Sequence, residues 1–580
     1  MLRLPTLPDV GGGALMTTLL IQLALTGAAW ADEPATVIAE PVAATVAVES
    51  AAPVSEPAPV TTAAPEPIQA PSESTPAGEP IDTTPKLSPP LPAPPPAPHR
   101  FAHNFGDSGW FIDTAGSIRY IGATHPDFVV DPYGTKVGQD FALDSRYRAS
   151  LGAGWKGLRA ETQWDFLTGQ VAGDTWDLPV TLDARRRDDL TATSRDGIVP
   201  RRASLTARSD DGFIIEAGLV PATTWGLGML ANGGEGDPLF GRTDRGDRML
   251  RFRMTAFPFS HGAKPLPIFL TVAFDRVVED DTARWRDGQI AYQVVGSLLW
   301  ADPMGRKGGV FYTYRTQTEP GDVKRPTDVS AIDGYVDMPL ALGDSGWKAR
   351  FAAEGAGLVG TTQRILTYAD PTSTKIRSGG FAALVSFDAP NNEARVQLRG
   401  GFASASGDPD ASKLQDFTFD SNYDVGMILF DELMGGVEAG TYALLTDTTN
   451  AGRPPYGADG LLTEGSFRRA TYVQPSITYA PIDWLEVRLG YVAAWGTGPI
   501  AQPFTTFRNG GTPTNQLGEE THGNYMGSEI DWAVGLGRGP HTLPWWFRPR
   551  LVVQGAAAIV GKNLGGGTLN QVMITGQVDW

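Results

Sequence analysis

The chain ends on the stretch QVMITGQVDW, Gln571–Trp580, in which polar and apolar residues largely alternate. Most odd-numbered residues of this stretch are polar, whereas the even-numbered ones, such as Val572 and Ile574, are apolar or glycine. A period of two is that of a strand with one apolar and one wet face. The last residues of soluble domains are usually polar and loosely held, so the stretch is either an unusual edge strand or the closing strand of a membrane barrel.

Segments of the same kind recur along the chain after Phe101. Arg146–Leu151 and Leu158–Phe166 carry a polar or charged residue at every second position, and a short glycine-containing stretch separates them. Leu250–Met254 and Leu485–Leu489 repeat the pattern. Such segments, of about ten residues with period two, are typical of transmembrane barrel strands. This region has no apolar stretch of about 18 residues, which excludes helical membrane spans.

These segments predict an all-β fold, a transmembrane antiparallel β-barrel of about 18 strands, with about 16 strands as the alternative. The predicted connections are short on one side, and on the other they include long stretches such as 226–246 and 407–465. A soluble sandwich or propeller would not be expected to separate short from long connections in this way. The stretch 437–447 also resembles a strand, but we reject it because it would leave an odd total. The predicted strands are 109–122, 140–154, 156–170, 200–209, 211–224, 247–259, 265–278, 288–301, 307–318, 328–342, 345–358, 376–388, 392–406, 466–480, 483–497, 526–538, 545–560 and 570–580.

Aromatic residues support a membrane location. Several tryptophans, among them Trp110, Trp155 and Trp347, fall near predicted strand ends, where an interfacial girdle would place them. A C-terminal aromatic residue on a closing strand resembles the sorting signal of outer-membrane barrel proteins. We therefore expect Trp580 to be an assembly signal for the barrel assembly machinery, and we expect the protein in the cell outer membrane.

Two segments are predicted to precede the barrel, which itself covers residues 101–580. Residues 1–31 combine a basic residue, an apolar run and the small-residue site Ala29-Trp30-Ala31, as a secretory signal peptide does. Residues 32–100 are rich in Pro and Ala and contain no Phe, Trp or Tyr, so they cannot build a core. We expect a disordered periplasmic tether, which would serve as a spacer or bind a periplasmic partner.

Composition excludes several classes of function. The formal net charge is −18 and no basic arm is present, so nucleic acid is not an expected partner. The absence of cysteine removes disulfides, thiolate metal sites and cysteine nucleophiles. The six histidines lie in the tether, loops or turns, and none joins a plausible nucleophile and base. We therefore expect no enzymatic activity, no cofactor and no bound metal.

The alternation also predicts which charged side chains face the lumen, and nearly all the cations among them are arginine. Two alternatives stay open: the arginines pair with acidic residues across neighbouring strands, or they line a path for anions. The chain is acidic as a whole, whereas the charged residues predicted to face the lumen are mostly basic. This separation of charge favours a path for anions. The predicted anion path consists of Arg146, Arg148, Arg159, Arg202, Arg251, Arg253, Arg350, Arg395, Arg399, Arg488, Arg548 and Arg550. The acidic residues predicted to face it include Glu161, Asp165, Glu216, Asp275, Asp333, Asp337, Glu354, Glu529 and Asp531.

The longest predicted external connection contains a hydrophobic segment that needs a cover. Asp420 or Ser421 is a candidate cap for a short helix with Val425, Ile428 and Leu433 on one face. We expect this loop to fold into the barrel as a constriction or to cover its mouth as a lid. The acidic residues could also bind Ca²⁺, but their spacing matches no EF-hand loop, which favours a solvated acidic loop. The residues proposed for the constriction or lid are Asp408, Asp410, Phe417, Phe419, Asp420 and Asp424.

This loop resembles a known family. The turn Ser406-Gly407-Asp408 after the strand that carries Arg399, together with the Phe-rich segment up to Met434, resembles the alginate-export family of outer-membrane barrels. That resemblance implies an 18-stranded barrel with an arginine-rich lumen that conducts an anionic polysaccharide outward. Asp420–Tyr423 and Leu429–Glu432 also resemble uncharacterised outer-membrane barrels of predatory and gliding bacteria.

The sequence therefore favours an outer-membrane channel for passive diffusion or export of anionic solutes, with an anionic polysaccharide as one candidate. Besides the assembly machinery and a periplasmic partner, outer-membrane lipid is an expected partner. A closed structural or adhesive barrel is the main alternative, and an outer-membrane enzyme is a weaker one. An energised receptor would need a plug domain and about 22 strands, and residues 32–100 are too polar and proline-rich to be that plug.

Overall fold

The computed structural model describes residues 101–105, 108–174, 196–209, 212–234, 239–241, 246–259, 266–321, 325–365, 372–406, 413–447, 449–450, 463, 465–537 and 548–580. The predicted signal peptide and tether lie outside these residues. The strands are β1 (Phe101–Asn104), β2 (Trp110–Val129), β3 (Lys136–Trp155), β4 (Leu158–Gly173), β5 (Asp196–Ser209), β6 (Phe213–Pro221), β7 (Arg248–Ala256), β8 (Ile268–Glu279), β9 (Ile290–Ala301), β10 (Lys307–Thr318), β11 (Thr327–Ala341), β12 (Lys348–Thr362), β13 (Thr374–Asp388), β14 (Ala394–Ala403), β15 (Lys413–Leu414), β16 (Ala470–Ile482), β17 (Leu485–Gly496), β18 (Tyr525–Leu536), β19 (Arg548–Val560) and β20 (Thr568–Asp579). The helices are α2 (Met434–Thr446) and α3 (Pro503–Arg508).

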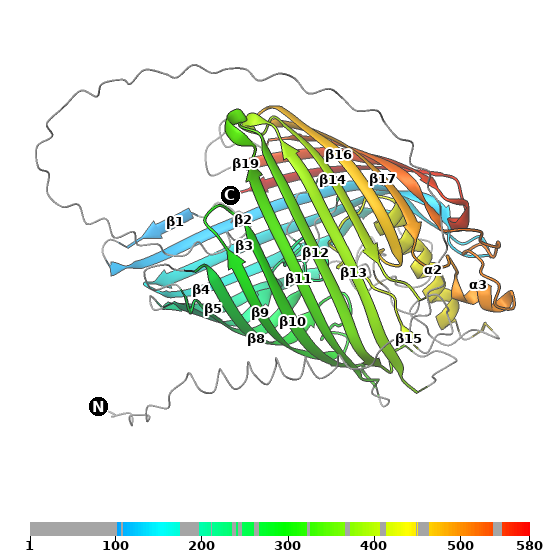
Figure 1. The fold of residues 1–580 in the computed structure, drawn as a ribbon, viewed down its shortest axis with the longest axis horizontal. Coiled ribbons are helices and arrows are strands. Elements are labelled where there is room, and N and C mark those ends of the chain that lie inside the picture. The colour runs from blue at the N-terminus through cyan, green and yellow to red at the C-terminus, as the bar shows by residue number, and fades with distance from the viewer. Residues whose placement is uncertain are drawn as a thin grey trace, which may run out of the picture. The chain divides into compact units, whose positions relative to one another are not determined.

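The strands form a closed antiparallel barrel (Figure 1). Strands that follow one another along the chain pair with one another, and β14 pairs with β16 because β15 is only two residues long. Closure comes from β2 and β20, whose register runs from Ser117 opposite Asp579 to Ala123 opposite Met573. Without the short strands β1 and β15, the 20-stranded sheet is a barrel of 18 strands. The predicted fold and strand number are confirmed, and each predicted range overlaps one barrel strand.

The two faces of the barrel differ as the alternation predicts. Outward side chains such as Leu205, Ile332 and Val396 are apolar and 53–58% exposed, whereas inward ones such as Asp333 and Glu354 are buried. So large an exposed apolar surface is stable only when lipid covers it. Closure also pairs the backbone N–H and C=O groups at the edges of the first and last barrel strands. Lipid requires this pairing because it offers no hydrogen bonds. Among the described residues, no helix has the length and apolar character needed to cross a membrane.

Short turns close one end of the barrel and long connections extend from the other. Turns such as those from β3 to β4 and from β16 to β17 span a few residues, whereas β6–β7 and β14–β16 are joined by far longer stretches. Helices α2 and α3 lie at the end with long connections, away from the C-terminus (Figure 1). In outer-membrane barrels the long loops face outward and the short turns face the periplasm, so we name the two ends external and periplasmic.

The connection from β14 to β16 corrects one prediction. The stretch 437–447, rejected as a strand, lies almost entirely in α2. The short helix predicted over Val425–Leu433 is wrong, because Phe430 and Asp431 have non-helical backbone angles. The backbone N–H groups of 427–429 donate to a glutamate of the barrel wall, which takes them away from helical pairing.

The main hydrophobic cluster lies inside the barrel. It joins side chains of the β14–β16 connection, including Phe417, Ile428 and Leu433, to wall residues such as Ala494 and Ala558. The wall residues of this cluster come largely from the external halves of β2 and β16–β20. The connection therefore packs into the external half of the barrel interior.

Candidate functional site

The connection from β6 to β7 also enters the barrel interior. We call its described residues 222–234 and 239–241 the cross-lumen segment. Trp225 of this segment donates a hydrogen bond from Nε1 to Asp333 of β11 at 3.0 Å. Its ring packs edge-on against Phe311 and Tyr335, with centroid distances of 5.1 and 4.8 Å. A tryptophan with a satisfied N–H and two aromatic neighbours is a firm attachment to this part of the wall.

Glu354 of β12 provides a second attachment for the cross-lumen segment. The backbone N–H groups of Leu227 and Met229 both donate to its carboxylate, the second at 3.2 Å. Glu354 is 1% exposed. A buried carboxylate is stable only when donors surround it, so this side chain and the loop backbone satisfy each other.

The far end of the cross-lumen segment is held by β17 and β19. Phe240 donates its N–H to Oε1 of Gln554 at 2.9 Å, and Nε2 of Gln554 donates to the carbonyl of Gly241 at 3.2 Å. Arg488 donates to the carbonyl of Leu239 at 3.2 Å and lies 4.8 Å from the centroid of the Phe240 ring. The segment thus leaves the wall at β6 and reaches two other sectors of it.

We call residues 415–433 of the β14–β16 connection the inward loop. Phe417 and Phe419 are at most 1% exposed. Phe419 packs edge-on against Phe417 and Phe467, with centroid distances of 5.7 and 4.8 Å, and the hydroxyls of Tyr423 and Tyr472 lie 2.7 Å apart. Edge-to-face contacts of this kind add directional packing to the area that the rings bury. The aromatic residues predicted for a constriction or lid therefore lie inside the barrel.

Glu529 of β18 holds the inward loop through three consecutive N–H groups. Met427, Ile428 and Leu429 donate to its carboxylate at 2.5, 2.9 and 2.8 Å. Glu529 is 1% exposed, so no bulk water replaces these donors. One buried side chain thus satisfies three consecutive N–H groups, which makes Glu529 a firm anchor of the loop.

A second anchor of the inward loop joins the strands that close the barrel. Glu432 accepts a hydrogen bond from Nε2 of Gln571 on β20 at 3.0 Å, and its Oε1 lies 2.9 Å from Nδ1 of His125 on β2. All three side chains are buried. The loop therefore contacts the wall on both sides of the β2–β20 seam.

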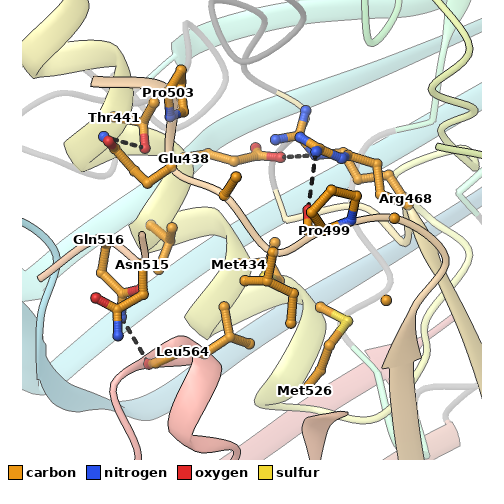
Figure 2. A pocket seen from close by; sticks show the side chains of 17 residues that line it. Met434, Glu438, Thr441, Arg468, Pro499, Pro503, Asn515, Gln516, Met526 and Leu564 are labelled. Atoms are coloured by element: carbon orange, nitrogen blue, oxygen red, sulfur yellow. Dashed lines mark hydrogen bonds and ion pairs between the residues drawn. The ribbon is translucent and has the colours of Figure 1, made fainter. Parts of the chain in front are cut away.

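Helix α2 follows the inward loop and borders a pocket at the external end, with an empty volume of about 600 Å³ (Figure 2). Polar residues around the pocket bond to each other. Glu438 of α2 lies 2.9 Å from Nε of Arg468, and Thr441 accepts from Gln502 at 3.3 Å (Figure 2). These contacts attach α2 to the wall and to the β17–β18 connection.

Asp420 joins the inward loop to the cross-lumen segment. Its carboxylate accepts from the N–H groups of Asn232 and Asn422 at 2.8 and 2.9 Å, and its own N–H donates to the carbonyl of Met229 at 2.8 Å. Asp424 lies against Gly241, where a Cβ would come within 2.1 Å of its carboxylate. The two segments therefore form one body inside the barrel.

We expect the attachment of this body to depend on pH. Burial raises the pKa of Asp420 to about 8, and the carboxylate of Asp281, which also binds Ser421, adds to the shift. A carboxyl in a detached, solvated loop would have a pKa near ~4. Because the pKa of Asp420 is higher in the attached state, its protonated form stabilises attachment fully below the detached pKa of ~4. This stabilisation is lost progressively as the pH rises to about 8, the pKa in the attached state.

We therefore expect detachment of the inward loop to become more frequent between pH 4 and pH 8. Hydrogen–deuterium exchange of the loop, measured across that range, tests this. Asp420→Asn is always neutral, so its exchange should depend less on pH than that of the wild type once the intrinsic chemical rate is subtracted. A corrected pH profile that is the same in both proteins would contradict the expectation.

The predicted lumen arginines lie on the inner face, and most pair with acidic residues of neighbouring strands. Arg148 pairs with Asp165 at 2.6 Å and Arg251 with Asp275 at 2.7 Å, both largely buried. The other ion pairs within this set are Arg159–Asp113, Arg159–Glu161, Arg202–Glu216, Arg253–Glu216, Arg350–Asp337 and Arg395–Asp388. Cross-strand pairing, the first of the two alternatives, is thus visible for these residues.

The remaining arginines of the predicted path have other surroundings. Arg399 lies 4.9 Å from the Tyr423 ring and donates to Gln474 at 3.2 Å, so it supports the inward loop as Arg488 supports the cross-lumen segment. Arg146 is buried on β3, and Arg548 and Arg550 lie at the periplasmic start of β19. Asp408 and Asp410 of the predicted loop lie outside the described residues.

Charge is unevenly distributed around the inner wall. Glu216 is shared between Arg202 and Arg253, at 3.3 and 2.7 Å, which leaves a net positive charge on this part of β5–β7. The wall carboxylates that hold the two inward segments instead lie on β11, β12 and β18 and accept from neutral N–H groups. The sector formed by β5–β7 is therefore basic, and the carboxylates that hold the inward segments lie in other parts of the wall.

No group of acidic or histidine side chains in the described ranges is arranged to hold a metal ion. Two of the acidic loop residues considered for Ca²⁺ already have other partners. Asp416 accepts from the N–H of Ser406 at 2.6 Å, and Asp420 accepts from backbone N–H groups.

The inward course of the cross-lumen segment was not predicted from the sequence. The alternation assigns residues 226–246 to a long external connection. The signal lay in the composition of Trp225–Gly234, where an aromatic and several apolar residues alternate with four glycines. Gly226 and Gly228 have positive φ, and a Cβ at Gly226 would meet the Glu354 carboxylate at 2.5 Å. Such close approach of backbone to wall is a reason for glycine.

Trp580 lies at the seam of the barrel. It exchanges two backbone hydrogen bonds with Gly116 of β2, at 2.9 and 3.0 Å. Its ring covers Gly116, where a Cβ would come within 2.2 Å. The residue predicted as the assembly signal thus also completes the pairing of the first and last barrel strands.

Comparisons with known proteins give a likeness of fold. No protein-family model matches the chain, and no curated protein matches its sequence. OccAB1 of Acinetobacter baumannii is 9% identical, with a TM-score of 0.44, over 80% of this chain and 96% of its own. The outer membrane protein OprD of Pseudomonas aeruginosa is 8% identical, with a TM-score of 0.45, over 80% and 93%. OccK8 (OprE) of the same species is 8% identical, with a TM-score of 0.43, over 81% and 98%.

Such low identities and scores transfer no property of those proteins to this chain, and the alginate-export resemblance finds no support among them. The classification rests on the barrel itself: closure through β2 and β20, an apolar outer face, and short and long connections at opposite ends. The protein is an outer-membrane β-barrel whose interior holds two segments of its own long connections.

Proposed function

We propose that the protein is an outer-membrane channel for the diffusion of small anionic solutes. The observation that carries this proposal is the exposure of arginines that face inward. The side chains of Arg159, Arg202, Arg253 and Arg350 are 26–41% exposed although they lie on the inner face. Exposure inside a closed wall means water-filled space, and positive groups around such space favour anions.

The two inward segments act as the constriction of this channel. They are attached to β2, β11, β12, β17, β18, β19 and β20, whereas the exposed arginines of β4, β5 and β7 lie on strands that provide none of these anchors. A solute entering from the periplasmic end would meet the basic sector first. An anionic polysaccharide, the other candidate solute, would require the anchored body to move aside. Small anions are therefore the better fit.

Single-channel recording of the barrel in a planar bilayer tests the proposal. We expect a steady conductance whose reversal potential under a salt gradient shows preference for anions. Deleting residues 408–434 should enlarge the conductance, because the inward loop leaves the lumen. The control is the same protein heat-unfolded before addition, which should give no steps. No conductance, even after the deletion, would contradict the channel and favour a structural or adhesive barrel.

A further inference from the structure

Three cationic side chains lie together near the external end of β13. Lys375 pairs with Lys413 of β15 in parallel register, which places their Cα atoms about 5 Å apart. Arg377 follows on the same face of β13, about 7 Å from Lys375 along the strand. All three side chains are exposed. They form a cluster of like charge, which we call the rim cluster.

The rim cluster faces outward. The register between β12 and β13 runs without a bulge from Lys348–Asp388 to Thr362–Thr374, so alternation holds along all of β13. Phe381 and Phe387, at odd positions like Lys375 and Arg377, are exposed to the outside at 48% and 46%. The even-numbered residues between them are buried toward the lumen. The cluster therefore belongs to the lipid-facing surface and not to the channel.

The height of the rim cluster matches the outer edge of the bilayer. Phe387 lies at the periplasmic end of β13, close to the short turn that follows it. Arg377 lies ten residues further toward the external end. At a rise of about 3.3 Å per residue and a tilt of about 40°, this separation is about 25 Å along the barrel axis, the height of the apolar band. Arg377 and Lys375 are thus at headgroup level.

Among the described residues, the rim cluster has no acidic partner. Within the parts of the chain that the structure describes, none of its three side chains forms an ion pair or a side-chain hydrogen bond. Asp328 of β11, the acidic residue in register across Thr361, lies two strands away and accepts from Tyr314 at 3.3 Å. Most other arginines of the barrel are paired, so a cluster with no acidic partner among the described residues is suited to bind an external anion.

We propose that the rim cluster binds phosphate groups of lipid in the outer leaflet of the outer membrane. An arginine fork can bind two phosphate oxygens at once, and lysines add point charges beside it. Basic residues at headgroup level attract anionic lipid in this way. Lys375 lies on β13 and Lys413 on β15, so a bound phosphate would also hold these two strands together. The binding is independent of any conduction through the lumen.

Lipid retention measured by native mass spectrometry tests this proposal. The full-length protein in neutral detergent is mixed with bisphosphorylated lipid A or with the same lipid after removal of both phosphates. The test variant is Lys375→Gln/Arg377→Gln/Lys413→Gln. The control variant, Lys156→Gln/Arg208→Gln/Lys348→Gln, removes the same charge at the periplasmic end. Heat-dependent gel mobility verifies that each barrel is folded, and Arg377→Gln alone replaces the triple variant if the latter does not fold.

The wild type and the control variant should retain the phosphorylated lipid at least fivefold better than the dephosphorylated one, and the test variant should lose most of this preference. Equal retention of both lipids by the wild type would overturn the proposal. So would a test variant that keeps the wild-type preference, because the phosphate would then bind elsewhere on the barrel.

Discussion

Glu529→Ala is expected to release the inward loop while the barrel stays closed. The substitution leaves the N–H groups of Ile428 and Leu429 without an acceptor in a buried site, and leaves Met427 only the neighbouring carboxyl of Asp531. Unpaired buried donors cost about 1–3 kcal/mol each. Even a total of about 3 kcal/mol shifts the balance between attached and detached loop by about 100-fold. The wall itself is held by strand pairing that Glu529 does not provide.

Limited digestion with chymotrypsin measures this release without reference to conduction. Phe417, Phe419 and Phe430 are buried in the wild type and should be cleaved only in the variant. Glu529→Gln keeps one acceptor oxygen and should give an intermediate rate, whereas Glu519→Ala, on an exposed external loop, should behave as the wild type. Equal digestion of Glu529→Ala and the wild type would show that the loop has another principal anchor.

Arg202→Gln combined with Arg253→Gln is expected to abolish the preference for anions. Glu216 would lose both of its partners, so this part of the wall would change from net positive to net negative. Charged groups around a narrow aqueous path raise the local concentration of counter-ions, and we expect the anion-to-cation permeability ratio to fall about three- to tenfold.

Reversal potentials under a salt gradient report this ratio directly. Glu216→Gln provides a control of opposite sign, because it leaves both arginines unopposed and should raise the ratio. Both proteins should keep a conductance close to that of the wild type, since neither substitution touches the inward segments. A shift in the same direction for both variants would mean that selectivity arises elsewhere in the lumen.

The barrel strands could be predicted because their signal is local. A residue such as Leu398 on β14 lies between two polar neighbours, and that alternation alone identifies its face. Closure then follows from strand number and from the connections, which is why the C-terminal stretch could be assigned to the seam. Ion pairs such as Arg148–Asp165 are also predictable in outline, because they join residues directly opposite on paired strands.

The filling of the lumen could not be predicted in the same way. The bond from Leu227 to Glu354 joins residues 127 positions apart, and that from Asn232 to Asp420 joins residues 188 apart. No periodicity connects such positions. Glu354 and Glu529 were predicted to face inward as partners of arginine. Their actual partners are backbone N–H groups, which are present in every loop and so leave no trace in side-chain composition.

The joining of the cross-lumen segment to the inward loop has a consequence for the maturation of the protein. Asp420 can accept from Asn232 only when strands as far apart as β6 and β16 already stand in one wall, and Glu529 adds the requirement that β18 is in place. Contacts of such long range form late. We therefore expect each newly inserted barrel to exist first with an open lumen that the two segments do not yet narrow. Until the segments dock, solutes would cross the outer membrane through this lumen with less selectivity than through the finished protein.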